Sequence, residues 1–151
     1  MEIIKKYKWL PVVVLTVLAG VLLFFYRFYR NDIKALKDFL ASYEGFDRAI
    51  SDFFISQTDD LEGQTGDALI ELDKKAALRL SSLIKNDAKL MGQALEVANF
   101  AGREFDSLMA YKGAIQSQKA DLDGLAKEHG DLTSERKAAY ARFRELGGLK
   151  D

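Results

Sequence analysis

The sequence has no cysteine, a single histidine (His129) and a single proline (Pro11) among its 151 residues. The absence of cysteine excludes disulfides, thiolate zinc sites, iron–sulfur clusters and lipid-modified cysteines. A single histidine removes most zinc and haem chemistry and any histidine-based triad. Because proline interrupts helices, its scarcity suits long continuous ones.

The sequence also lacks an excess of charge of either sign. Lys and Arg total 22 and Asp and Glu total 23, so the net charge is −1. A nucleic-acid-binding protein needs a basic surplus to neutralise phosphates, and no nucleic-acid partner is therefore expected. The length allows one domain and an anchor.

One long segment, residues 9–26 (WLPVVVLTVLAGVLLFFY), contains no charge at all. A bilayer core is crossed by about 20 apolar helical residues, with a lower limit of about 17. Aromatic rings and cations flank the segment, as they do at headgroup depth. The pattern predicts a short basic tail over residues 1–8 and a transmembrane anchor helix over 9–29. The expected anchoring residues are Lys5, Lys6, Trp9, Tyr26, Arg27, Tyr29 and Arg30.

Two alternatives to an anchor are a buried core helix and a cleavable signal peptide. Residues 17–19 (Val-Leu-Ala) loosely fit a small-residue cleavage site. Seven apolar or aromatic residues follow Ala19, however, where a mature secreted chain would turn polar. A run of this length with these flanks is rare in soluble folds. An uncleaved signal anchor in the cell membrane is favoured.

The charges that decide orientation are evenly balanced. Three lysines and the terminal amine precede the segment, and Arg27, Arg30, Lys34 and Lys37 follow it. A short basic tail before an apolar run is typical of a signal anchor. Residues 31–151 carry 17 basic and 22 acidic groups, a net of −5, which gives them little attraction to an anionic cytoplasmic leaflet. We expect a cytoplasmic N-terminus and an extracytoplasmic C-terminal domain.

After residue 30, apolar residues recur every three or four positions and never alternate over strand length. The expected fold is all-α, with the anchor helix continuing into an antiparallel bundle of three or four helices. The first helix, over 30–56, has an apolar stripe that Asp47 interrupts. A polar linker with three plausible N-caps follows over 57–67, then a helical hairpin or bundle over 68–147 and a tail over 148–151. The candidate caps are Thr58, Thr65 and Asp67.

The bundle region itself contains two long apolar patterns. The first predicts one helix, with a possible break at Asn86-Asp87, and its spacing of about 3.6 residues favours packing in a bundle over a two-stranded zipper. The second, over 120–146, has a seam that is partly polar at His129 and Arg136. We expect a turn between them at 112–119, a possible break at Gly130-Asp131 and a helix stop at Gly147-Gly148. The first stripe comprises Leu69, Leu72, Ala76, Leu80, Ile84, Ala88, Met91, Leu95, Ala98, Gly102, Phe105 and Met109.

Three small residues, Ala94, Ala98 and Gly102, share one face of the expected second helix. They indicate either a tight seam for a neighbouring helix or simply an alanine-rich helix. Aromatic side chains dominate interface energetics. The residues expected to pack helices or contact a partner are Phe53, Phe54, Ala94, Ala98, Gly102, Phe105 and Phe143.

No motif for catalysis, cofactor binding or metal binding is found. An EF-hand with Gly63 at its sixth position would place Leu69 at the twelfth, where a glutamate is required. Ala126 stands three residues before His129, which excludes a Glu-x-x-His di-iron pair. The sequence has no Gly-x-Ser-x-Gly elbow and no phosphate-binding loop. We assign no catalytic, cofactor-binding or metal-binding residue and expect neither enzymatic activity nor a cofactor.

These patterns favour a non-catalytic single-pass membrane subunit that anchors, supports or assembles a larger membrane or envelope complex. Its partners would be the lipid bilayer and other protein subunits, in a hetero-complex or a homo-oligomer. One alternative is a sensor or ligand-binding module, since an anchored helical bundle resembles chemoreceptor sensory domains in layout. Another is a self-assembling filament subunit. A phage inner-membrane spanin is similar only in its short anchor and helical ectodomain, and the eleven glycines do not favour it.

Overall fold

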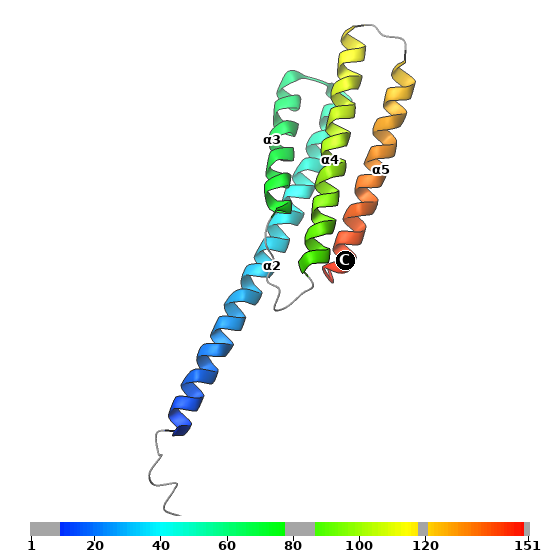
Figure 1. Cartoon of the computed structure of the whole chain (residues 1–151). Coiled ribbons are helices and arrows are strands. Elements are labelled where there is room, and N and C mark those ends of the chain that lie inside the picture. Colours follow the sequence, from blue (N-terminus) through cyan, green and yellow to red (C-terminus); the bar gives the residue numbers. More distant parts are fainter. Residues whose placement is uncertain (1–9, 78–86, 118–120, 150–151) are drawn as a thin grey trace, which may run out of the picture.

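The computed structural model describes residues 10–77, 87–117 and 121–149, which form four helices and no strand. The helices α3, α4 and α5 lie alongside the carboxyl half of α2, whose amino half extends alone beyond them (Figure 1). The predicted all-α fold, in which a long apolar N-terminal helix continues into a bundle, is confirmed. The helices are α2 (Leu10–Ser56), α3 (Asp59–Ala76), α4 (Asp87–Gln116) and α5 (Leu122–Leu146).

The helix α2 runs unbroken from its apolar half into the bundle. No proline lies in its interior, and Gly45 costs only about 1 kcal/mol relative to alanine. In its carboxyl half one face is buried at intervals of three or four residues. That face consists mainly of aromatic side chains: Leu36, Phe39, Tyr43, Phe46, Ile50 and Phe53.

The predicted polar linker over 57–67 is wrong, because α3 already begins at Asp59 and only Gln57 and Thr58 separate it from α2. The Thr58 side chain accepts a hydrogen bond from the Leu61 amide at 3.4 Å, which caps the helix. Three acidic residues in the first turn further favour a helix N-terminus. Thr65 is buried inside the helix instead of capping it, and it donates a hydrogen bond to the Ala49 carbonyl of α2 at 3.1 Å. Together these interactions outweigh the propensity cost of two internal glycines.

The first apolar pattern of the bundle region forms two helices, in agreement with the possible break at Asn86-Asp87. One helix, α3, ends at Ala76 and the next, α4, begins at Asp87. The phase of an apolar stripe is not maintained across such a break. In α4 the buried positions are accordingly shifted from the predicted ones, and Leu95 is 47% exposed. The buried positions of α4 include Leu90, Ala94, Val97, Ala98, Ala101, Glu104 and Leu108; Leu80 and Ile84 of the predicted stripe lie outside the described residues.

The last helix, α5, is continuous through Gly130-Asp131, so the predicted break there is wrong. The Asp121 carboxylate caps α5 by accepting a hydrogen bond from the Gly124 amide at 3.1 Å. The predicted stop is confirmed, since the helix ends at Leu146 and Gly148 has a φ of +65°.

The predicted turn at 112–119 begins too early, because α4 continues to Gln116. Lys112, expected in the turn, therefore belongs to α4. Its Nζ atom lies 2.5 Å from Asp59 Oδ1 and 2.6 Å from Glu62 Oε2, both on α3.

The helices do not approach one another equally closely. The pairs α4–α5, α2–α3 and α3–α4 pack along their lengths, whereas α2 and α5 are joined through large side chains. The Phe39 and Phe143 rings lie 4.5 Å apart between centroids, and the Tyr43 and Tyr140 rings stack at 3.5 Å. The aromatic side chains therefore bridge the widest seam of the bundle.

Candidate membrane anchor and buried polar network

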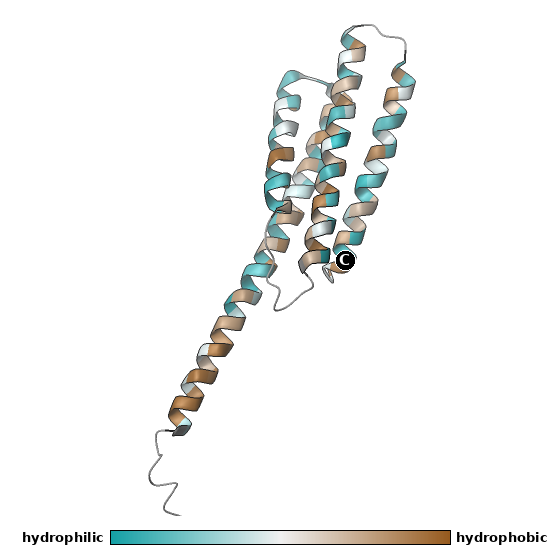
Figure 2. Cartoon of the chain, in the orientation of Figure 1, coloured by the Kyte–Doolittle hydropathy of each residue, from teal (hydrophilic) through white to brown (hydrophobic). Residues whose placement is uncertain are grey.

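The amino half of α2 presents apolar side chains to its surroundings in every direction. Figure 2 shows this half as the longest hydrophobic stretch of the ribbon. Of the helices that the structure describes, α2 alone is long and apolar enough to cross a membrane, and no residue of its apolar window is buried. From Leu10 to Tyr26, 17 residues at about 1.5 Å each span roughly 26 Å, close to the thickness of a bilayer core.

The predicted anchoring residues at the carboxyl end of this stretch are all exposed. Tyr26 is 64% exposed and Tyr29 49%, and the side chains of Arg27 and Arg30 are exposed as well. Rings and cations at this position match the headgroup region of a bilayer. Lys5, Lys6 and Trp9 lie outside the described residues.

Most of the residues predicted to pack helices or contact a partner lie inside the bundle. Phe53, Ala94, Ala98 and Phe143 are buried, and Phe54, Gly102 and Phe105 are half-buried. The ring of Phe105 lies 6.3 Å from that of Phe53 between centroids. A Cβ added to Gly102 would meet no atom within 4 Å, so no helix packs tightly against that position. In this fold these side chains hold the chain's own helices together.

A buried polar network joins three helices of the bundle at mid-height. Arg136 of α5 is fully buried, and its guanidinium binds the carboxylate of Glu104, itself fully buried on α4. It also donates to Asp47 of α2, with Nη2 and Oδ1 2.6 Å apart. The hydroxyl of Thr133 donates to Glu104 Oε1 at 2.5 Å. A buried charge pair is favourable only when it is hydrogen-bonded in this way.

Aromatic rings surround the charged atoms of this network. The Arg136 guanidinium lies 5.1 Å from the ring centroid of Tyr43 and 5.4 Å from that of Phe46, within the range of cation–π attraction. Burial raises the pKa of Tyr43 far above its usual value, so the phenol stays neutral.

His129 lies at the edge of the same network. Its ring stacks on Phe54 at 4.7 Å between centroids, and its Nε2 is 3.9 Å from Glu104 Oε1. Burial lowers the pKa of His129, and the nearby Glu104 carboxylate offsets this only in part. The ring is therefore mostly neutral at neutral pH.

Sequence reasoning identified the polar positions Asp47, His129 and Arg136 but missed Glu104. The signal was present, since Val97, Ala101, Glu104 and Leu108 follow one another at spacings of four, three and four. Glu104 is a carboxylate on an apolar stripe, and the last helix has Arg136 in its own apolar seam. Together the two positions predict a buried ion pair. It was missed because the stripe was placed on the wrong face of α4.

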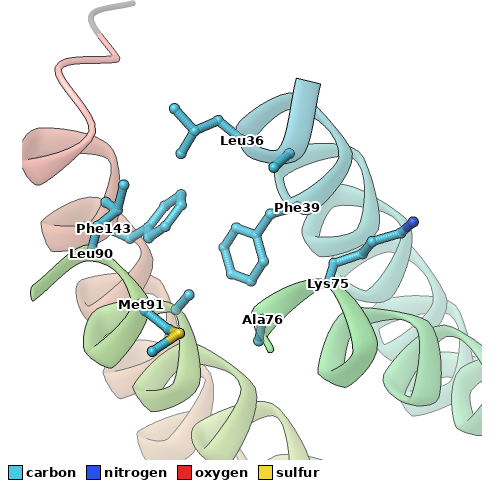
Figure 3. Close-up of a pocket in the computed structure, with 9 residues that line it drawn as sticks. Leu36, Phe39, Lys75, Ala76, Leu90, Met91 and Phe143 are labelled. Atoms are coloured by element: carbon cyan, nitrogen blue, oxygen red, sulfur yellow. The ribbon is translucent and has the colours of Figure 1, made fainter. Parts of the chain in front are cut away.

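The hollows of the bundle differ in what they can hold. One lies where the Phe39 and Phe143 rings face each other, with Leu36, Leu90 and Met91 around them (Figure 3). Its volume of about 10 Å³ has room for one water molecule. A second, open groove of about 330 Å³ runs between α2 and α5. It is lined by Ile50, Ser51, Phe54, Ile55, Glu104, Ala126, His129, Gly130 and Thr133.

Within the described ranges, no group of three or more His, Asp or Glu side chains is placed to hold a metal ion. The fold and these features define a helical protein with one apolar N-terminal helix long enough to cross a membrane. No protein-family model, curated protein or solved structure matches the chain.

Proposed function

We propose that this protein is a non-catalytic, single-pass membrane subunit that anchors or assembles a larger complex. The observation that carries the proposal is the division of α2 into two halves with opposite environments. The amino half is apolar and exposed, and the carboxyl half supplies the aromatic face around which α3, α4 and α5 pack. Such a helix fixes a folded bundle to a bilayer.

The surface of the bundle supports a role in assembly. Every described aromatic side chain from Phe39 onward is buried or half-buried, so partner contacts of the bundle would fall to the large apolar residues that stay exposed. Ile55, at the end of α2, is 79% exposed, and others lie on the remaining three helices. They are Ile70 at 53%, Leu95 at 47%, Ile115 at 39% and Leu146 at 48%.

Purification from native membranes in a mild detergent tests this function. We expect the chain to remain in the membrane fraction after alkaline carbonate treatment and then to co-purify with other subunits or with copies of itself. Recovery as a detergent-solubilised monomer without a stoichiometric companion would contradict the assembly role and leave the anchor intact. Electron microscopy of the purified material separates a filament from a complex of defined size.

A second candidate, a membrane-anchored ligand-binding module, is favoured by the groove between α2 and α5. Its volume of about 330 Å³ lies at the lower end of small-molecule sites, and apolar and polar side chains both line it. A thermal-shift screen tests this candidate, because a ligand that binds the folded state raises Tm. A hit is confirmed when Ser51→Trp, an exposed position that lines the groove, abolishes the shift.

The proposed orientation places the bundle outside the cytoplasm and the N-terminus inside. It is supported by the short basic tail and by the net charge of −5 after residue 30. Fusion of a compartment-dependent reporter after Asp151 distinguishes the two topologies. Activity of a reporter that works only in the cytoplasm would reverse the assignment.

A further inference from the structure

Three cations follow the apolar half of α2 on a single face. Arg27, Arg30 and Lys34 are separated by three and four residues, and side chains at these spacings lie next to one another on a helix. All three are exposed. Together with Leu23, Tyr26 and Asn31 they form one open side of the helix surface.

This basic face points away from the bundle. Leu36, buried against the other helices, comes two residues after Lys34 and is therefore about 200° around the helix. Of the acids near the cations, Asp32 is buried, and Asp38 is half-buried one turn beyond Lys34 on the same face, without an ion pair to it. Among the residues that the structure describes, the three cations form no ion pair, so their charge is available to an external anion.

The position of the basic face along the helix axis indicates which kind of anion it would bind. Arg27 directly follows the roughly 26 Å apolar stretch, and Lys34 lies about 10 Å farther along the axis. In a bilayer that interval corresponds to the headgroup layer on one side of the hydrocarbon. We propose that Arg27, Arg30 and Lys34 form a binding site for the phosphate of an anionic phospholipid. This inference rests on the proposed membrane anchor.

The negative charge of the rest of the chain restricts attraction to an anionic surface to the basic face of α2. Residues 35–151 carry 16 basic and 21 acidic groups, so in either leaflet an anionic bilayer surface repels the bundle while it attracts the basic face of α2. The two opposing forces hold the base of α2 among the headgroups and keep the bundle clear of the surface.

Lipid selectivity of the full-length chain, reconstituted in phosphatidylcholine bilayers, tests the proposal. Trace spin-labelled phosphatidylglycerol or phosphatidylcholine reports the fraction of each lipid held at the protein. We expect a several-fold preference for phosphatidylglycerol at low salt, which weakens as salt screens the charges. The triple variant Arg27→Gln, Arg30→Gln, Lys34→Gln should abolish it.

The matched control is Lys74→Gln, Lys89→Gln, Lys127→Gln, which removes the same charge from exposed positions on α3, α4 and α5. It should retain the preference. An equal loss in both variants, or no preference in the wild type, would overturn the lipid site. Resistance to alkaline carbonate, measured on the same samples, keeps this outcome distinct from failure of the anchor, since a chain that is extracted was never in the bilayer.

Discussion

At the residue scale, we expect the bundle to be sensitive to substitution at the buried Arg136–Glu104 pair. Both side chains are fully buried, and Arg136 Nη1 has no hydrogen-bond partner among the described residues. The arginine therefore depends on its two carboxylates. Desolvation offsets much of the attraction in such a pair, whereas removal of one partner leaves an uncompensated buried charge.

We predict that Glu104→Ala lowers the free energy of unfolding by about 3–5 kcal/mol, because it leaves a buried guanidinium without its main counter-charge. The control is Glu96→Ala, which breaks the exposed pair with Arg142 at 2.9 Å and should cost under about 1 kcal/mol. Urea unfolding of the detergent-solubilised chain, followed by circular dichroism, measures both. Equal losses in the two variants would contradict a dominant role for the buried pair.

A second residue-scale prediction concerns pH. Burial depresses the pKa of His129 in the folded chain, so the unfolded chain binds the proton more readily. Stability should be complete above the unfolded pKa of about 6.5 and should fall as pH drops through the window below it. His129→Phe, which retains a ring against Phe54, should flatten this part of the profile.

The measurement is Tm at about pH 7.5 and about pH 5 for both chains. The carboxylate of Asp59, whose pKa the Lys112 ammonium lowers, loses its charge in a more acidic range and does not interfere. If His129→Phe has the same slope as the wild type, the histidine is not the group responsible.

At the element scale, the α2–α3 turn is tighter than its sequence indicates. Gln57 has a φ of +50°, in the left-handed region that favours glycine, and its amide donates to the Phe53 carbonyl at 2.8 Å. The residues 57–67 are polar and contain two glycines, a composition typical of a linker. Tertiary contacts at Thr65 and Lys112 make this segment a helix, and sequence periodicity does not report such contacts.

We predict that Gln57→Gly stabilises the chain by up to about 1 kcal/mol, since glycine removes the strain of the left-handed backbone but loses more entropy on folding. Gln57→Val should instead destabilise by about 1 kcal/mol or more, because a β-branched residue fits poorly there. The midpoints of thermal unfolding compare the two variants. A loss of stability with glycine would show that the side-chain contact with the Phe54 carbonyl outweighs the strain.

Helix type could be predicted from periodicity, helix number only as three or four, and helix ends only where a local signal exists. Thr58 as a cap and Gly147-Gly148 as a stop are local signals, and the structure contains both. The face that α4 buries depends on where α3 ends, which is set by packing among helices. For that reason the stripe in α4 was misplaced and Glu104 was missed.

At the scale of the whole molecule, the exposed apolar half of α2 determines where the protein resides. We predict that Leu18→Arg, near the centre of this half, impairs membrane integration, because an arginine at mid-bilayer costs about 2.5–3.5 kcal/mol in insertion. The control Leu18→Phe should integrate normally. The fraction of chain that resists alkaline carbonate extraction measures both, and equal integration of the two variants would contradict a span centred on this residue.

If α2 spans a bilayer as proposed, this uninterrupted helix also transmits the tilt of the span to the bundle. From Asp32 to Ser56, α2 continues for about 36 Å. Single spans tilt by about 20° on average, and a lean of that size would carry the far end of the rod sideways by roughly 12 Å. Since no joint interrupts α2, any rotation of its lipid-embedded part turns the bundle by the same angle. In the proposed arrangement, bilayer thickness would therefore set the angle at which the bundle stands on the membrane.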